Sequence, residues 1–414
     1  MTYFFSEAEN FYQKTNPEQL IGDFGSPLFV YNENIFRARC REMAQLVPYE
    51  NFKVTYSMKA NSNLTLLEIA HEEGLHADAM SPGEIFLLEK AGFASEEVFY
   101  ISNNVSDEEM QFAIDRGITT SVDSISQLRR YGRLNPGGNV CVRFNTVVGA
   151  GHHEKLVTGG KKTKFGVNQD KTDIVISVLK EYNLKLIGIN QHIGSLFMDG
   201  EKYLDSIRSI LDTASKFDSL EFVDFGGGFG IPYKKQEGQK RLELKKFGQH
   251  FADILNDWTD KYGRKIMFRI EPGRYISAEC CILLGSVYAR KNNYENVYIG
   301  TDLGFNALIR PAMYDSHHEI EVYRKGKLVK NTDEEIANVV GNICESGDIM
   351  AGDRMLPVIE EADILGVMDA GAYGYSMSSN YNNRLRPAEV LIKSDSSTKL
   401  IRRRDTLEDL IRNF

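Results

Sequence analysis

A lysine, a histidine and a cluster of glycines each stand directly after a short apolar run of the sequence. Lys59 lies in Tyr56-Ser-Met-Lys-Ala-Asn61, and His192 lies in Gln191-His-Ile-Gly-Ser195. Burial in an apolar pocket lowers the pKa of a lysine ammonium, so that the free amine can attack a carbonyl group and form an imine. A lysine at a strand end is more often a solvated charge, so the neighbouring motifs must decide between the two interpretations.

The other motifs carry groups that suit a phosphorylated aromatic ring. Glycines such as those in Phe225-Gly-Gly-Gly-Phe-Gly230 let backbone N–H groups approach a phosphate, although a tight turn is the commoner explanation. His192 is either a flat ring for stacking or a hydrogen-bonded core histidine, and Ser195 offers a hydroxyl for the phosphate. In Glu271-Pro-Gly-Arg274, the carboxylate can keep a pyridine nitrogen protonated, which makes the ring an electron sink. The guanidinium can bind a phosphate or a carboxylate, and a surface ion pair is the alternative.

Short β-branched or aromatic runs alternate with amphipathic helical stretches from about residue 52. Eight such units predict a (β/α)8 barrel, although an open doubly wound sheet has the same periodicity. A barrel places its active site at the C-terminal ends of its strands, where Asp78, Glu84 and Arg143 also stand. The predicted strands are 52–60, 76–81, 98–102, 119–123, 140–145, 186–192, 222–225 and 266–271.

After about residue 275 strand patterns follow one another with few helices, which predicts a mostly antiparallel β domain. The run 27–31 is a further strand that can pair with this domain. We therefore expect a barrel over 33–274 and a β domain over 1–32 and 275–414, which supplies substrate-binding and catalytic residues and dimer contacts. Polar segments gather in this β domain at 302–315, 344–348 and 371–381.

The composition excludes several classes of function. The net charge is -9 with charges of both signs scattered, so neither nucleic acid nor an anionic membrane is an expected partner. Five irregularly spaced cysteines predict no disulfide framework and no metal site. We see neither a signal peptide nor an apolar run long enough to cross a membrane, so we expect a cytoplasmic protein.

The motifs together resemble the fold-type III pyridoxal-phosphate-dependent decarboxylases, in the same order and over about residues 27–404. The Lys-Ala-Asn, His-Ile-Gly-Ser, Gly-Gly-Gly and Glu-Pro-Gly-Arg stretches are shared across that family, which includes ornithine and arginine decarboxylases. This chain departs from the family at Asn103-Asn104-Val-Ser106, where many members have a loop that contains a lysine. The segment 149–164 is a candidate mobile lid. The stretches that resemble the diaminopimelate branch are 309–314, 344–348, 376–382, and 149–153 with 158–160 and 164–166.

The resemblance implies a role for each matching residue toward pyridoxal 5'-phosphate. Lys59 is similar to the Schiff-base lysine, Glu271 to the partner of the pyridine nitrogen, and His192 to the stacking histidine. The phosphate site is expected at Ser195, Gly226, Gly227 and Gly228. The other residues that we place at the cofactor are Asp78, Arg143, Gly273, Arg274 and Tyr373.

For the substrate, the resemblance implies that Arg274, Arg310 and Tyr314 hold the distal carboxylate. Glu345 would bind the distal amine, Tyr373 would contact both cofactor and substrate, and Cys344 would donate a proton. Because the family takes Cys344 and Glu345 from the partner subunit, the resemblance also implies a homodimer.

The implied reaction is decarboxylation of meso-2,6-diaminopimelate to L-lysine and CO₂. Relatives that act on D-ornithine, D-lysine, carboxynorspermidine or carrier-bound glutamate share most of these residues, so the substrate stays open at this point. An alanine-racemase-like enzyme should lack the Cys344-Glu345 pair. A catalytically inactive binding homologue would be expected to have lost Lys59, Glu271 or Cys344, all of which are present.

Overall fold

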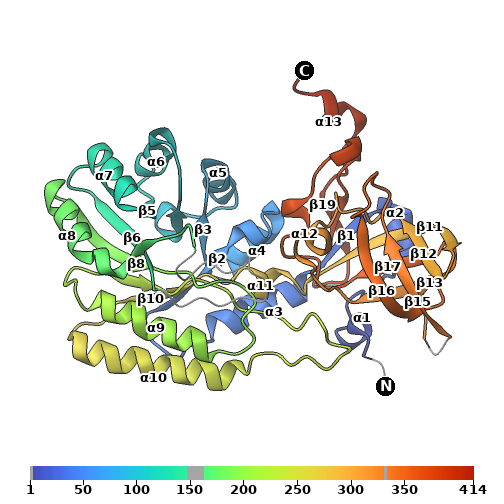
Figure 1. The fold of residues 1–414 in the computed structure, drawn as a ribbon, viewed down its shortest axis with the longest axis horizontal. Coiled ribbons are helices and arrows are strands. Elements are labelled where there is room, and N and C mark those ends of the chain that lie inside the picture. The colour runs from blue at the N-terminus through green and yellow to red at the C-terminus, as the bar shows by residue number, and fades with distance from the viewer. Residues whose placement is uncertain (1–2, 147–162, 331–332) are drawn as a thin grey trace. The chain divides into compact units, whose positions relative to one another are not determined.

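The computed structural model describes residues 3–146, 163–330 and 333–414, and it divides into two compact units (Figure 1). The first unit comprises residues 1–38, 232–240 and 277–414, and the second comprises residues 39–231 and 241–276. In the described part of the chain, no helix combines the length and the apolar character needed to cross a bilayer.

The second unit is built on a closed parallel sheet, which confirms the predicted barrel. Each strand pairs with the next in parallel register, β10 pairs with β2, and a β5–β6 pairing completes the ring. A short strand, β7 (Val167–Asn168), adds to β6 outside the ring. The eight barrel strands are β2 (Phe52–Ser57), β3 (His76–Ala79), β4 (Val98–Ile101), β5 (Thr119–Val122), β6 (Asn139–Asn145), β8 (Lys185–Asn190), β9 (Phe222–Asp224) and β10 (Met267–Ile270).

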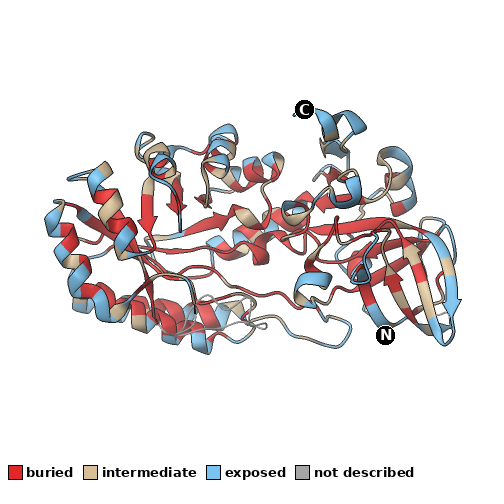
Figure 2. Cartoon of the chain, turned by 45° about the horizontal axis from the view of Figure 1, so that its top comes forward, coloured by how far each residue is buried: buried red, intermediate tan, exposed pale blue. Residues whose placement is uncertain are grey.

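Amphipathic helices surround these strands and expose their outer faces, as Figure 2 shows. Serine caps define where several of them begin: Ser81 Oγ accepts from the Glu84 N–H at 3.2 Å, and Ser106 forms a capping box with Glu109. Inside the barrel, Phe99 and Phe222 pack with Cys141 in an apolar cluster. The helices that lie within this unit are α4 (Leu64–Glu72), α5 (Pro82–Lys90), α6 (Asp107–Ile114), α7 (Ile125–Leu134), α8 (Thr172–Glu181), α9 (Glu201–Ala214) and α10 (Leu244–Tyr262). Two others, α3 (Glu33–Ala44) and the buried α11 (Arg274–Ser277), each contain residues of both units.

The first unit contains a ten-stranded mixed sheet, which confirms the separate β domain. The predicted N-terminal strand lies inside it, because β1 pairs antiparallel with β11 and parallel with β18. The strands are β1 (Leu28–Asn32), β11 (Cys281–Asn293), β12 (Asn296–Thr301), β13 (Ile320–Arg324), β14 (Lys327–Leu328), β15 (Glu334–Val340), β16 (Ile349–Pro357), β17 (Ile364–Val367), β18 (Ala388–Ile392) and β19 (Thr398–Arg402). Its short helices are α1 (Phe5–Ala8), α2 (Pro17–Phe24), α12 (Arg310–Tyr314) and α13 (Leu407–Ile411).

The segment 232–240 follows β9 of the barrel in sequence but belongs to the first unit. The side chain of its Lys235 is 9% exposed, and the Nζ atom lies 2.6 Å from Asp369 Oδ2 and 3.4 Å from Glu279 Oε1. Two carboxylates around one ammonium compensate for its loss of water and raise the pKa of Lys235 against the effect of burial. This buried ion pair holds the segment within the first unit.

Candidate active site

Lys59 lies just beyond β2, in the 3-10 turn Met58–Ala60. Its Nζ is 3.9 Å from Asp78 Oδ2 on the neighbouring strand β3, and 37% of the lysine side chain is exposed. Asp78 is itself fully buried and accepts hydrogen bonds from Ser57 Oγ at 2.9 Å and from the Met58 N–H at 3.2 Å. Burial raises the pKa of Asp78, and the Lys59 charge opposes that rise. The turn therefore leaves Lys59 partly open beside a carboxylate.

His192 follows β8 and is held as a neutral ring. The Gly227 N–H donates to its Nδ1 at 3.1 Å, which makes that nitrogen an acceptor. Burial, together with the positive charges of Lys59 and Arg143, holds the pKa of His192 well below its usual value. An uncharged imidazole at this position can present a flat face to an aromatic ring.

The three glycines after β9 form a cradle that has no room for a side chain. A Cβ on Gly227 would lie 2.0 Å from the Glu271 carbonyl oxygen, and one on Gly226 would lie 2.4 Å from the Gln191 carbonyl oxygen. Gly228 has a φ of +108°, and its Cβ would lie 2.5 Å from the Gly194 carbonyl oxygen. The backbone after β9 thus approaches its neighbours more closely than any residue except glycine permits.

Two further sequence-predicted residues meet beside this cradle. Arg274, at the start of α11, places Nη2 3.2 Å and Nε 3.4 Å from Ser195 Oγ. A guanidinium and a hydroxyl side by side are a suitable pair for one phosphate or carboxylate group. Both residues belong to the barrel unit.

Glu271, directly after β10, is almost completely buried. Its Oε1 accepts no hydrogen bond from the described residues. Burial, with the negative charges of Asp224 and Asp78, raises the pKa of Glu271 well above its usual value. An orphaned carboxyl oxygen of this kind is suited to a ligand that brings a cationic N–H.

Arg143 on β6 lies near the strand ends as predicted, with a partner that the sequence analysis missed. Its Nε is 3.8 Å from Asp123 Oδ1, and its guanidinium lies 4.5 Å from the centre of the Phe165 ring. Asp123 follows β5 at the position where other strands carry site residues, and this regularity could have identified it. The predicted lid 149–164 lies almost entirely outside the described residues, as do the 149–153 and 158–160 motifs.

In the first unit, Arg310 at the start of α12 is 2% exposed and held from several sides. Its Nη1 lies 2.8 Å from His318 Nε2, and its Nη2 donates to Ser316 Oγ at 3.3 Å. The guanidinium also lies 4.7 Å from the centre of the Tyr233 ring. His318 Nδ1 lies 2.8 Å from the Met368 carbonyl oxygen, so Nδ1 is the donor and Nε2 accepts from Arg310. Sequence analysis missed His318 and Tyr233, since neither lies in a motif of its own.

Cys344 and Glu345 lie on an exposed but braced loop of the same unit. The Cys344 N–H donates to Asn382 Oδ1 at 2.8 Å, and Tyr381 Oη donates to Glu345 Oε1 at 3.0 Å. Buried Asp348 closes the loop by accepting from the Ile343 N–H at 2.8 Å. Two predicted tyrosines belong to the same unit. Tyr373 has a φ of +58°, and Tyr314, which ends α12, is half-buried.

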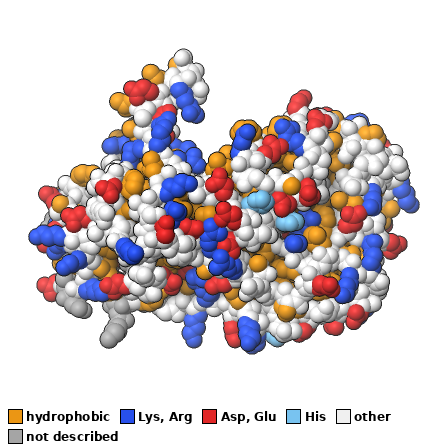
Figure 3. All heavy atoms as spheres, turned by 180° about the vertical axis from the view of Figure 1, so that it is seen from behind, with side chains coloured by type: hydrophobic (Ala, Val, Ile, Leu, Met, Phe, Trp, Pro, Cys, Tyr) orange, Lys and Arg blue, Asp and Glu red, His pale blue; other side chains and the backbone are white. Residues whose placement is uncertain are grey.

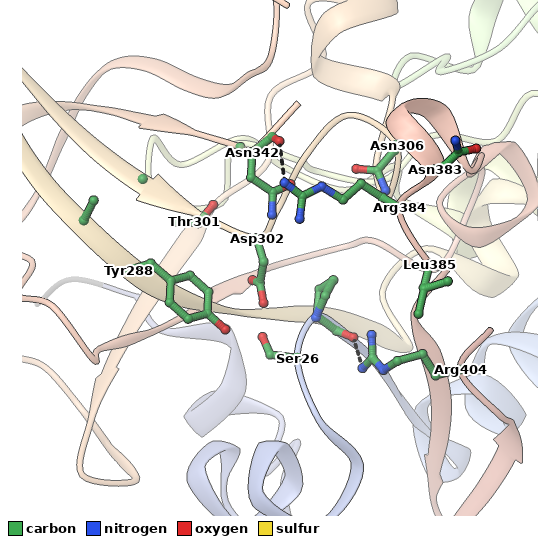
Figure 4. A pocket seen from close by; sticks show the side chains of 14 residues that line it. Ser26, Tyr288, Thr301, Asp302, Asn306, Asn342, Asn383, Arg384, Leu385 and Arg404 are labelled. Carbon is green, nitrogen blue, oxygen red and sulfur yellow. Dashed lines mark hydrogen bonds between the residues drawn. The ribbon is translucent and has the colours of Figure 1, made fainter. Parts of the chain in front are cut away.

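A separate cavity of about 700 Å³ opens in the first unit and is lined by none of the predicted site residues (Figure 4). Two of its arginines are tied to backbone: Arg404 Nη2 donates to the Pro27 carbonyl at 2.6 Å and Arg384 Nη2 to the Asn342 carbonyl at 3.1 Å. In these contacts the arginines join distant parts of the chain.

Residues 33–278, which include every barrel strand and the groups at their ends, match the family described as "Pyridoxal-dependent decarboxylase, pyridoxal binding domain". The chain is therefore a pyridoxal-dependent decarboxylase.

Its full length matches one branch of that class. It is 41% identical over 403 residues to the diaminopimelate decarboxylase of Methanothermobacter thermautotrophicus, with 95% of this chain and 92% of the relative covered. The chain belongs to the diaminopimelate decarboxylase family. The Helicobacter pylori enzyme complexed with L-lysine is similar in structure, with a TM-score of 0.87, 27% identity, and coverage of 96% of this chain and 98% of that one. The M. jannaschii enzyme in co-complex with L-lysine has a TM-score of 0.82 and 32% identity, with 96% of this chain and 94% of that chain covered.

The barrel residues fit pyridoxal phosphate. The side-chain-free backbone of Gly226, Gly227 and Gly228 is of the kind whose N–H groups can approach a phosphate, and the orphaned Glu271 oxygen has the chemistry to face a protonated ring nitrogen. Among the described residues, no group of histidine, cysteine and acidic side chains could hold a metal ion.

Gly227→Ala should weaken cofactor binding about 10- to 100-fold, because forcing a methyl group against backbone costs about 1–3 kcal/mol. Equilibrium dialysis, followed by the visible absorbance of the bound cofactor, measures the loss. Gly83→Ala is the matched control, since its Cβ would meet only Ser81 Oγ at 3.7 Å. Cofactor affinity equal in the two variants would contradict the cradle.

Proposed function

We propose that this chain decarboxylates meso-2,6-diaminopimelate to L-lysine and CO₂, a step of lysine biosynthesis. Diaminopimelate decarboxylases match it over nearly its whole length, and two similar solved enzymes are complexed with L-lysine, the product of this reaction. The observation that carries the choice of substrate is the fixed guanidinium of Arg310, because a substrate with a second carboxylate needs a dedicated cation.

The barrel unit holds the cofactor. Lys59 provides the amine for its carbonyl carbon, His192 stacks on its ring, and Glu271 faces the ring nitrogen. Ser195 and the cradle Gly226, Gly227 and Gly228 bind its phosphate, and Asp78, Arg143, Gly273 and Arg274 complete the barrel's set. Tyr373, from the first unit, adds a further cofactor contact. Bound pyridoxal phosphate supplies an electron sink for the bond that breaks. Neutral His192 and the 3.9 Å approach of Lys59 to Asp78 support these roles.

Arg310, with Arg274 and Tyr314, binds the distal carboxylate, and Glu345 binds the distal amine. The hydrogen bond to His318 and the Tyr233 ring remove most of the rotational freedom of the Arg310 side chain. A side chain ordered in advance loses less entropy when it binds, which favours a substrate that presents a carboxylate at that point.

Cys344 Sγ delivers the proton to the substrate's Cα after CO₂ leaves, and we propose that Cys344 and Glu345 act in the site of a partner subunit. Their loop is exposed yet firmly hydrogen-bonded, as expected for a loop that completes a neighbour's site. We further propose that this homodimer works in the cytoplasm, where disulfide bonds are rare, because none of the five cysteines, which all lie in the described residues, forms a disulfide bond. Acidic and basic side chains intersperse on the face in Figure 3, which agrees with a small-molecule substrate and not with a polyanion.

Release of CO₂ from the cofactor-loaded enzyme tests the substrate. We offer meso-diaminopimelate beside D-ornithine, L-ornithine and L-lysine, and we expect a preference for meso-diaminopimelate in kcat/KM of at least about 100-fold, since a buried guanidinium without its carboxylate is costly. A preference for another amino acid would mean that Arg310 and Glu345 have a different ligand.

Loss of the His318 acceptor should affect binding of the distal carboxylate more than the chemical step. For His318→Ala we expect KM for meso-diaminopimelate to rise about tenfold with a much smaller change in kcat, because the arginine loses its orientation. His318→Asn, which keeps a hydrogen-bond acceptor, is the control. Inhibition by L-lysine should weaken in parallel, whereas inhibition by 1,5-diaminopentane, which lacks a carboxylate, should not. Equal weakening of both inhibitors would contradict the role of Arg310.

Mixing two inactive variants tests the shared site. Lys59→Ala and Cys344→Ala should each be inactive, and random reassortment of the two should restore about a quarter of wild-type activity, because half the dimers then hold one complete site of two. A mixture of Lys59→Ala with Glu271→Ala is the control and should stay inactive, since both changes damage the same unit. Absence of any recovery in the first mixture, with mixed dimers verified by differential tags, would place Cys344 in its own chain's site.

A further inference from the structure

The cavity drawn in Figure 4 has no part in the proposed reaction. It measures about 700 Å³, within the range of roughly 300–1,000 Å³ that small-molecule sites occupy. Its walls come from β11 and β12, from the chain just before β1 and just after β15, from the segment that precedes β18 and from the chain beyond β19. All of these belong to the first unit, so the cavity is defined within that unit alone.

Two guanidinium groups stand in this cavity, and within the described chain both hydrogen bond to backbone carbonyls alone. Arg404 Nη2 donates to the Pro27 and Phe24 carbonyls at 2.6 Å and 3.4 Å, and Arg384 Nη2 donates to the Asn342 carbonyl at 3.1 Å. These bonds hold the two side chains in place. A carbonyl group carries no net charge, so the positive charges of both arginines can serve an anionic ligand.

Two acceptor groups line the same cavity. Asn306 is 5% exposed, and its Oδ1 accepts no hydrogen bond from the described residues. Asp302 is also buried, and its Oδ1 accepts from the Ser286 N–H at 2.9 Å. Burial raises the pKa of Asp302, and the charge of Arg404 is among the interactions that oppose this rise. Buried acceptors are normally hydrogen-bonded, so an orphaned amide oxygen in one cavity with a carboxylate is suited to an ammonium group.

The charges of the lining match a ligand that has one more carboxylate than ammonium groups. The charged residues of the lining are Arg384, Arg404 and Asp302, which together carry one net positive charge. A dicarboxylic α-amino acid has two carboxylates and one ammonium at neutral pH, and therefore one net negative charge. A simple dicarboxylate would also meet the two guanidinium groups, but it offers no cation to Asp302 and no donor to Asn306 Oδ1.

We propose that this cavity binds a dicarboxylic α-amino acid, with its two carboxylates at Arg384 and Arg404 and its ammonium group between Asp302 and Asn306. The site goes beyond the proposed decarboxylation and does not rest on it, since the cavity is lined by none of the residues that we place at the cofactor or the substrate. Both guanidinium groups are hydrogen-bonded before a ligand arrives, so their side chains lose less entropy when it binds.

Calorimetric titration of the cofactor-loaded enzyme with L-glutamate tests this site. Glutarate, which has the same two carboxylates but no amine, should bind at least about tenfold more weakly, because it leaves the Asn306 oxygen without a donor. Arg384→Gln should weaken the binding of L-glutamate at least about tenfold, since it removes one of the two cations. Arg208→Gln is the matched control, because Arg208 is an exposed arginine of helix α9 that pairs with Asp205, and it should bind L-glutamate as the wild type does.

A second variant tests the contact with the amine separately from the shape of the cavity. Asn306→Ala should weaken the binding of L-glutamate and leave the binding of glutarate unchanged, whereas equal losses for both ligands would contradict the ammonium contact. Absence of L-glutamate binding at millimolar concentration would mean that the cavity holds only water, and equal wild-type affinity for the two ligands would also overturn the proposal. So would an affinity that is unchanged in Arg384→Gln but lost in Arg310→Gln, since it would place the ligand in the active site.

Discussion

The absence of side chains at Gly226, Gly227 and Gly228 is the constraint on which the barrel site depends. Closure of the ring brings the chain after β9 against the ends of β8 and β10, so closely that a Cβ at Gly227 would overlap the Glu271 carbonyl. This close approach orders the neighbours as well. It allows the Gly227 N–H to reach His192, and it allows the Glu271 N–H to reach the Gly226 carbonyl. The orientation of the neutral His192 ring, the close packing of the three glycines and the position of the Glu271 backbone are therefore consequences of one backbone packing.

The sequence predicts those parts of the molecule that short-range patterns determine. The eight barrel strands are apolar runs at regular spacing, and their ends identify Lys59, His192 and Glu271 as neighbours before any coordinates are known. In the β domain, exposed and polar residues interrupt strands such as β16, so that no apolar run marks where such a strand begins and ends. The excursion of 232–240 into the first unit is also missed, because the ion pairs of Lys235 depend on residues more than forty positions away.

The site residues also divide into those that a sequence motif identifies and those that only the packed structure identifies. Arg310 can be identified from its motif, but its partners cannot. Tyr233 contacts the guanidinium with the face of its ring, and His318 accepts a hydrogen bond from it. Both contacts depend on the three-dimensional position of the residues, so no local sequence pattern indicates them. The residues around Lys59 leave two environments open, a solvated charge or an amine buried in an apolar pocket. The 3-10 turn after β2 leaves the side chain partly open, and Asp78 provides its electrostatic environment. The residue types in the sequence thus indicate which reactions the site can support, whereas the packing around each group determines its protonation state.

The place of β1 in its sheet has a consequence for synthesis on the ribosome. Its parallel partner β18 pairs Leu28 with Ala388, and its antiparallel partner pairs Leu28 with Leu284. A nascent chain translated from the N-terminus therefore carries the apolar strand β1 without its parallel partner until residue 388 and those after it have been synthesised. Both neighbours of β1 are distant in sequence, and closing such long loops is slow. Because its partners come from Cys281–Asn293 and Ala388–Ile392, this sheet can be completed only after nearly the whole chain has been synthesised.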